Sequence, residues 1–282
     1  MNFGGLEPQY ASLKNATFVI VPVPYDLTST YQSGARRGPL AILEASGNME
    51  LFDEELGKET FRCGIHTTDF LEVNASGPEA MVYAVREKIH GLVALKKIPV
   101  MLGGEHSLSP GAVEALREQY PDLSVLQFDA HADLRDDYQG SPYSHACAGR
   151  RMSELCPLVQ VGIRSLSAEE AAFMKEASVK TFFAHSMFRE PNWISQICEN
   201  LHDDIYITID LDVLDPAFMP ATGTPEPGGL SWQQLLDIIR AVSARCRVRG
   251  LDVVELAPIP GLVAPDFLAA KLIYRIMGYL TP

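Results

Sequence analysis

Short runs of apolar and β-branched residues recur along the chain and predict its strands. They occupy residues 18–21, 99–102, 123–128, 158–163, 179–184, 205–211 and 248–254. Each run is continuously apolar instead of alternating with polar residues, which is typical of strands that are covered on both faces. We therefore expect a buried sheet.

Segments with the apolar spacing of helices separate these runs. They span residues 112–120, 168–176, 193–201, 232–245 and 267–279. Strands that alternate with helices predict an α/β fold, a three-layer α/β/α arrangement around a central, mostly parallel sheet. The pattern does not give the order of the strands. The Pro/Gly-rich stretch 215–229 is predicted to be one long functional loop.

Length and composition narrow the class of protein. Sheets of this kind reach 282 residues as one unit, so residues 1–282 are expected to form a single domain. The chain is 47% hydrophobic and 21% charged, the balance of a soluble protein with a large core. We see neither a signal-peptide pattern nor an apolar stretch near the ~20 residues of a membrane span, and expect a cytoplasmic protein without membrane contact.

Charge and cysteine content bear on partners and compartment. The formal net charge of −13 disfavours nucleic acid, because phosphate binding needs a positive surface. The same acidic field mildly favours a small cationic substrate. Five scattered cysteines without a Cys-x-x-Cys pair are expected to be reduced thiols.

Four predicted strands end in groups that can bind metal or act in catalysis. These ends are residues 103–106 (Gly-Gly-Glu-His), 129–133 (Asp-Ala-His-Ala-Asp), 210–212 (Asp-Leu-Asp) and Glu255. Open parallel sheets bind ligands at the carboxyl ends of their strands, so the four ends are expected on one rim. Alternation in an extended chain would turn the ligands within each segment to the same side. The glycine pair 103–104 is expected to permit a tight turn beside the site.

Six residues are therefore candidate metal ligands: His106, Asp129, His131, Asp133, Asp210 and Asp212. Burying such a cluster without a cation costs on the order of several kcal/mol, so bound metal is the natural compensation. Six ligands are too many for one tetrahedral zinc and suit two metals that share carboxylates. Oxygen and imidazole donors without a thiolate favour manganese over iron, cobalt or zinc. A lone His106 or a lone Asp-x-Asp is often structural, and the joint occurrence favours the metal site.

At these positions the sequence resembles the ureohydrolase family of arginases and agmatinases. The similar segments are 103–107 (Gly-Gly-Glu-His-Ser), 129–133 and 208–216, with further similarity at 24–26, 34–39 and 252–258. The resemblance covers nearly the whole chain. Two departures are Glu105, where the family often has Asp, and Ala221, where it often has Gly. Neither residue is a candidate ligand.

The resemblance implies an arginase-like fold and two manganese ions per chain. One ion would be held by His106, Asp129, Asp133 and Asp210. The other would be held by His131, Asp129, Asp210 and Asp212, so that Asp129 and Asp210 bridge the pair. It further implies that Glu255 matches the charge of a guanidinium, that His145 carries a proton to the departing amine, and that the protein assembles as a homotrimer or homohexamer.

Within the family, the flank of the 129–133 segment looks like that of agmatinases. Arginases typically have an Asn where this chain has Arg135, so recognition of an α-carboxylate is not expected. The expected substrate is agmatine, which gives putrescine and urea, or a relative such as aminopropylagmatine. Asp136, Asp137 and Glu226 are candidates to meet its second positive charge. Arg164 is expected to support the fold through a salt bridge.

Three alternatives stay open. A guanidinobutyrase or another guanidino-acid ureohydrolase is indicated if Arg135 or Arg164 faces the pocket. A zinc-dependent acetylpolyamine deacetylase shares the type of sheet, although His106 and Asp212 favour two metals. A catalytically silent relative that serves as a regulator would lack a ligand or the proton carrier, and this chain has all of them.

Overall fold

The fold is built on one central sheet of eight strands, as a computed structural model describes it for residues 1–189 and 191–281. The strand order is β4-β1-β5-β10-β9-β6-β7-β8, and every neighbouring pair is parallel. The bounds are β1 (Phe18–Val23), β4 (Ile65–Thr67), β5 (Ile98–Gly103), β6 (Ser124–Phe128), β7 (Leu158–Ile163), β8 (Val179–Phe183), β9 (Asp204–Asp210) and β10 (Arg247–Val254). A separate antiparallel hairpin joins β2 (Phe52–Asp53) to β3 (Lys58–Glu59).

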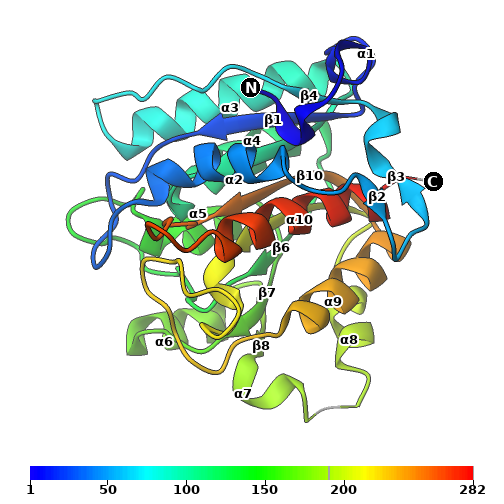
Figure 1. Cartoon of the computed structure of the whole chain (residues 1–282). Coiled ribbons are helices and arrows are strands. Elements are labelled where there is room, and N and C mark those ends of the chain that lie inside the picture. The colour runs from blue at the N-terminus through cyan, green and yellow to red at the C-terminus, as the bar shows by residue number, and fades with distance from the viewer. Residues whose placement is uncertain (190, 282) are drawn as a thin grey trace.

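Helices cover both faces of the sheet, as Figure 1 shows. One face packs against α2 (Gly38–Ser46), α8 (Trp193–Glu199), α9 (Trp232–Arg245) and α10 (Ala264–Tyr279). The other packs against α3 (Pro78–Ala94), α4 (Ser109–Gln119), α5 (Ala148–Leu155) and α6 (Ala168–Glu176). Along β1, Ile20 joins the first core while Val19 and Val21 join the second, because successive side chains of a strand point to opposite faces. The predicted α/β/α layers are confirmed.

Short elements complete the chain. Two are single helical turns, α1 (Pro8–Ala11) and α7 (Ala184–Met187). The 3-10 segments are η1 (Phe3–Gly5), η2 (Ala35–Arg37), η3 (Thr60–Cys63), η4 (His106–Leu108), η5 (His145–Cys147) and η6 (Leu211–Val213). Three of these, η4, η5 and η6, begin at or beside candidate site residues.

Local sequence explains where several helices begin. Ser167 and Glu170 form a capping box at the start of α6, and Ser231 and Gln234 form one at α9, so both helices start where predicted. α4 and α10 each begin three residues before the predicted start, and each has a proline in its first turn. Proline is tolerated there because its missing N–H would have no helical partner.

Strand β8 corrects one prediction. Residues 179–184 were expected to be covered on both faces, but β8 is the edge strand, paired only with β7, and Lys180 is exposed. An edge strand has fewer neighbours to bury it. The other predicted runs are buried almost throughout.

The sheet topology positions the site. β5, β10, β9 and β6 are consecutive in the sheet, and they are the four strands whose ends carry the candidate groups. Their carboxyl ends therefore form one rim, as predicted. All five cysteines are unpaired. Over residues 1–189 and 191–281, no helix is both long and apolar enough to span a bilayer.

Candidate metal centre and active-site pocket

The candidate ligands converge through turns and not through strand alternation. β6 ends at Phe128, and His131 still forms a parallel bridge with Ser165. The segment leaves the extended conformation at Asp133, whose φ is 52°. Asp210 ends β9, while Asp212 lies in the 3-10 turn η6 and donates its N–H to Asp210 Oδ1 at 2.9 Å. The expectation that alternation alone aligns these side chains therefore fails at Asp133 and Asp212. Turns at Asp133 and Asp212 instead direct these carboxylates toward His106 and His131 respectively.

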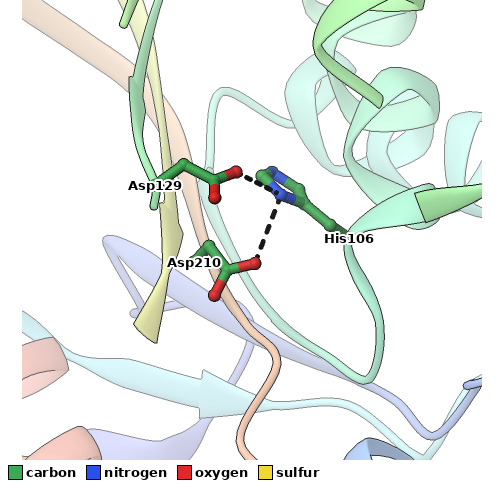
Figure 2. A group of neighbouring side chains, drawn as sticks. All are labelled: His106, Asp129 and Asp210. Atoms are coloured by element: carbon green, nitrogen blue, oxygen red, sulfur yellow. Dashed lines mark ion pairs between the residues drawn. The ribbon is translucent and has the colours of Figure 1, made fainter. Parts of the chain in front are cut away.

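His106 is the centre of the first group of ligands, and Figure 2 shows it with Asp129 and Asp210. Its Nδ1 lies 3.0 Å from Asp129 Oδ2, 3.3 Å from Asp133 Oδ2 and 3.6 Å from Asp210 Oδ2. All four side chains are buried. Three carboxylates thus face one imidazole nitrogen away from bulk water.

The hydrogen bond of the other ring nitrogen of His106, Nε2, determines whether Nδ1 carries a proton or a lone pair. Thr208 donates its hydroxyl hydrogen to Asp252 Oδ1 at 2.6 Å, so His106 Nε2, 2.9 Å from the same hydroxyl, must donate to it. In the neutral ring, Nδ1 then carries a lone pair, and it has no hydrogen-bond partner among the described residues. A lone pair surrounded by three carboxylates requires a cation, either a proton or a metal ion. The donor set fits a hard divalent metal.

His131 is the centre of the second group. Its Nδ1 lies 2.9 Å from Asp212 Oδ2 and 3.7 Å from Asp129 Oδ1. The two oxygens of Asp129 therefore face different histidines. His106, Asp129 and Asp210 form one cluster with metal-binding geometry, and Asp129, His131 and Asp212 form another. The shared carboxylate is what a two-metal site requires.

Without metal, the cluster holds protons instead. Burial disfavours a charged His106, but the carboxylates of Asp129, Asp133 and Asp210, which would accept from a protonated Nδ1, outweigh it and raise the pKa of His106 well above the usual value. Burial likewise opposes protonation of His131, while Asp212 and Asp129 raise its pKa to about 11. Burial and the neighbouring Asp129 raise the pKa of Asp133 to about 7. The cluster thus has a strong demand for positive charge.

A cavity of about 280 Å³ opens onto these ligands. His131, Asp133 and Asp210 contribute to its lining, as do both candidate catalytic residues, Glu255 and His145. Residues 29–32 of the loop that follows β1 supply part of the wall. The structure therefore brings the predicted metal ligands and both predicted catalytic residues to one place.

Glu255 is held in an unusual conformation at the end of β10. Its φ is 65°, in the left-handed region, its N–H donates to Gly104 O at 2.7 Å, and its Oε1 accepts from the His106 N–H at 2.7 Å. Burial and the neighbouring Glu105 raise its pKa well above the ordinary value. A cation bound beside Glu255 would restore the ionised carboxylate.

His145 begins the 3-10 turn η5 at the cavity wall. Burial, followed by the positive charge of His131 and His106, lowers the pKa of His145 to about 4. Tyr138 packs edge-on against its ring, with centroids 6.0 Å apart. The imidazole is therefore neutral at physiological pH and can accept a proton from the cavity side.

Glu170 is a cavity residue that was not predicted. Its carboxylate is 4% exposed and accepts from the Leu134 N–H at 2.9 Å and the Ser167 N–H at 2.6 Å. Arg135, also in the lining, has its Nε 4.0 Å from Glu170 Oε2 and stacks over Tyr138. The sequence signal at Glu170 is that of a helix cap, which the residue also is.

The predicted amine contacts lie elsewhere. Asp136 is exposed and pairs with Arg151 at 2.6 Å, and Asp137 Oδ1 accepts from the Gly140 N–H at 3.1 Å. Neither residue lines the cavity, nor does Glu226, whose Oε1 lies 3.9 Å from His131 Nε2. The acidic residue of the outer wall is Glu170 instead.

Arg164 supports the long loop through hydrogen bonds to backbone carbonyl oxygens and not through the predicted salt bridge. Its guanidinium donates to the carbonyl oxygens of Asp212 at 2.6 Å and Glu226 at 2.7 Å, in place of the expected salt bridge to a carboxylate. The 215–229 stretch is closed at its base by Asp215, whose carboxylate accepts from the N–H groups of Gly228 and Gly229. Arg164 does not line the cavity.

Known proteins resemble this chain over nearly its whole length. A sequence profile described as the arginase family matches residues 16–278. The N(1)-aminopropylagmatine ureohydrolase of Synechocystis is 41% identical over 278 residues, covering 95% of this chain and 90% of that relative. The agmatinase of Pyrococcus horikoshii is 32% identical, covering 97% of this chain and 95% of that relative. The crystal structure of the agmatine ureohydrolase of Thermoplasma volcanium matches with a TM-score of 0.87 at 32% identity, covering 95% of this chain and 91% of that chain.

Proposed function

The chain belongs to the arginase family and is a ureohydrolase, and we propose that it releases urea from aminopropylagmatine or agmatine with the help of two manganese ions. The observation that carries the dinuclear proposal is Asp129, whose Oδ2 and Oδ1 face His106 and His131 respectively. The relatives named above support a guanidino substrate that also carries an amine.

The six candidate ligands would hold the metals in the two sets given by the family resemblance. When bound, manganese lowers the pKa of water toward neutrality and stabilises developing negative charge. The oxygen and imidazole donors, the lone pair of His106 Nδ1 and the protons held by the metal-free cluster all support this assignment.

Two residues of the cavity wall would act directly on the substrate. The Glu255 carboxylate, fixed by the His106 N–H, would orient the planar guanidinium and match its charge. His145, neutral and partly facing the cavity, would carry a proton to the nitrogen of the departing amine as the C–N bond breaks. Both residues line the one cavity that opens onto the candidate ligands.

Urea release is the first measurement. The manganese-loaded protein should be assayed against aminopropylagmatine, agmatine, arginine, guanidinobutyrate and acetylputrescine, with metal counted on the same sample. Urea from one of the two amines, with about two metals per chain, supports the proposal. Acetate from acetylputrescine and a single zinc would replace it with the deacetylase. Absence of any product from every compound would favour the catalytically silent alternative.

Arg135 gives the guanidino-acid alternative a specific basis. It lines the cavity, so it would meet a terminal carboxylate such as that of guanidinobutyrate. In this structure its charge is partly balanced by Glu170 at 4.0 Å. The balance between these two side chains would therefore decide whether the cavity prefers an amine or an acid.

Glu170→Gln tests that balance. The substitution keeps a carbonyl oxygen for one of the two backbone donors, the N–H groups of Leu134 and Ser167, and leaves Arg135 without its counter-charge. We expect KM for aminopropylagmatine and agmatine to rise about tenfold, roughly 1.4 kcal/mol, and KM for guanidinobutyrate to fall. Asp136→Asn, on an exposed carboxylate outside the cavity, is the control and should leave KM unchanged. A rise of equal size for all three substrates would refute the electrostatic role.

Metal loading should depend on pH. The histidines of the metal-free cluster have raised pKa values, about 11 for His131, so at neutral pH metal must displace protons. Acid adds protons to the metal-free form and so weakens metal binding. We expect the increase in Tm produced by a fixed manganese concentration to be smaller at pH 6 than at pH 8. An equal or larger increase at pH 6 would contradict this.

A further inference from the structure

The hydroxyl of Thr28 lies between a buried carboxylate and the ring of His145. Thr28 Oγ1 donates to Glu105 Oε1 at 2.7 Å and lies 3.2 Å from His145 Nδ1. The same oxygen accepts from the backbone N–H of His145 at 3.0 Å. The three residues come from the loop after β1, the end of β5 and the start of η5, so the tertiary fold alone brings them together.

These contacts fix which nitrogen of His145 carries the proton. A threonine hydroxyl has one hydrogen and two lone pairs. Glu105 takes the hydrogen, and the His145 N–H occupies one lone pair. The other lone pair faces Nδ1, which must therefore be the N–H form. In the neutral imidazole, Nε2 is then unprotonated and basic.

The surroundings of Glu105 agree with this direction of hydrogen bonding. Its two oxygens also accept from the Ser107 hydroxyl at 2.6 Å and the Thr28 N–H at 2.7 Å, and the Ser29 hydroxyl lies 3.4 Å away. An ionised carboxylate can only accept, so the hydroxyls of Ser107 and Thr28 donate to it, as the Thr28 N–H does. Ser144 Oγ, at 3.4 Å from His145 Nδ1, is the more distant neighbour of the ring.

We propose that Thr28 and Glu105 are positioning residues for His145, an inference that rests on the proposed ureohydrolase reaction. They hold the proton on Nδ1 and leave Nε2 to exchange protons with the cavity, where His145 has no hydrogen-bond partner for Nε2 among the described residues. Nε2 would first take a proton from the water that attacks the guanidinium carbon. As the C–N bond breaks, its electron pair goes to the amine nitrogen, which takes that proton from Nε2. The Nδ1 proton stays in the hydrogen bond to Thr28 throughout.

Glu105 differs from the aspartate common in the family, and its length has a role in this arrangement. The carboxylate reaches both the N–H and the hydroxyl of Thr28, at 2.7 Å each. Thr28 itself does not line the cavity, so it acts through His145 and not on the substrate.

Thr28→Val and Thr28→Ser form a matched pair that tests the proposal. Valine keeps the branched shape and removes the hydroxyl, whereas serine keeps the hydroxyl. We expect Thr28→Val to lower kcat for urea release about 10- to 100-fold, with KM and metal content unchanged, and Thr28→Ser to stay within about threefold of the parent. Thr28→Ala serves as the second hydroxyl-free variant if the valine methyl groups disturb the loop.

A double-mutant cycle separates positioning from a structural role. In a His145→Ala background, Thr28→Val should cause no further loss of kcat, because its effect passes through the imidazole. Equal losses in both backgrounds, or full kcat in Thr28→Val, would overturn the inference while the ureohydrolase assignment stands. A parent protein that releases no urea from any guanidino compound would overturn the proposed function and this inference together.

Discussion

Asp212→Ala is expected to remove or loosen one manganese ion and to lower kcat by about a thousandfold or more. Asp212 is buried, and its Oδ2 lies 2.9 Å from His131 Nδ1 at the centre of the second ligand group. Loss of one metal removes on the order of several kcal/mol of charge stabilisation, and each ~1.4 kcal/mol is a factor of ten in rate. The measurement is kcat together with metal counted per chain.

Two comparisons make this result specific. Asp212→Asn keeps the side-chain volume and an oxygen for the Ala130 N–H, which Asp212 Oδ1 accepts at 3.0 Å, so a similar loss there points to the charge and not to a cavity. Asp122→Ala, on an exposed carboxylate, should leave kcat and metal content unchanged. Full activity of Asp212→Ala with a single metal per chain would end the dinuclear proposal and point to a mononuclear hydrolase.

The metal motifs were predictable because each is local. The 129–133 segment, with three ligands inside five residues at the end of an apolar run, carries its chemistry in sequence alone. Parallel strands bring their carboxyl ends to one rim whatever their order, so convergence at β5, β10, β9 and β6 could be expected before that order was known.

The way the ligands converge was not predictable. Alternation assumes an extended chain, and the left-handed Asp133 and the turn at η6 break that assumption. A left-handed conformation is rare for a residue other than glycine, so no sequence pattern indicated it. The same holds for Glu255, which is also left-handed.

Several residues around the cavity could not be predicted, because their roles depend on contacts with residues that are distant in the sequence. Thr28 lies 77 residues from Glu105 and 117 from His145, and neither separation leaves a periodic signal. Glu170 was missed for a different reason. It is the last residue of a Ser-x-x-Glu capping box, and this structural role already explains a glutamate at that position. Helix α3 is another omission, although it buries Met81, Val85 and Ile89 at helical spacing.

The glycine pair before His106 also has a different reason from the expected one. Neither Gly103 nor Gly104 has a positive φ, so a turn does not require them. A Cβ at Gly104 would lie 1.9 Å from the carbonyl oxygen of Tyr25. Glycine is needed because the backbone at Gly104 lies directly against the backbone at Tyr25.

Gly104→Ala is therefore expected to destabilise the protein by about 3 kcal/mol or more, which would lower Tm by roughly 10 °C. The backbone has little room to move away, because the Gly104 N–H donates to Val23 O at 3.0 Å and its carbonyl accepts from the Glu255 N–H at 2.7 Å. Relief of the clash would displace the adjacent Glu105 and His106, so metal content should fall as well. Thermal unfolding and metal counting on the same sample measure both effects.

Gly91→Ala is the matched control, because the same substitution should stabilise the protein at that position. Gly91 is exposed in helix α3, and a Cβ would meet nothing within 4 Å. Replacing a helical glycine by alanine stabilises by about 0.5–1 kcal/mol, so Tm should rise slightly with metal content unchanged. If Gly104→Ala instead kept the parent Tm and metal content, the close contact between Gly104 and Tyr25 would have to be more adaptable than the bonds to Val23 and Glu255 imply. The rigid placement of His106 would then need another cause.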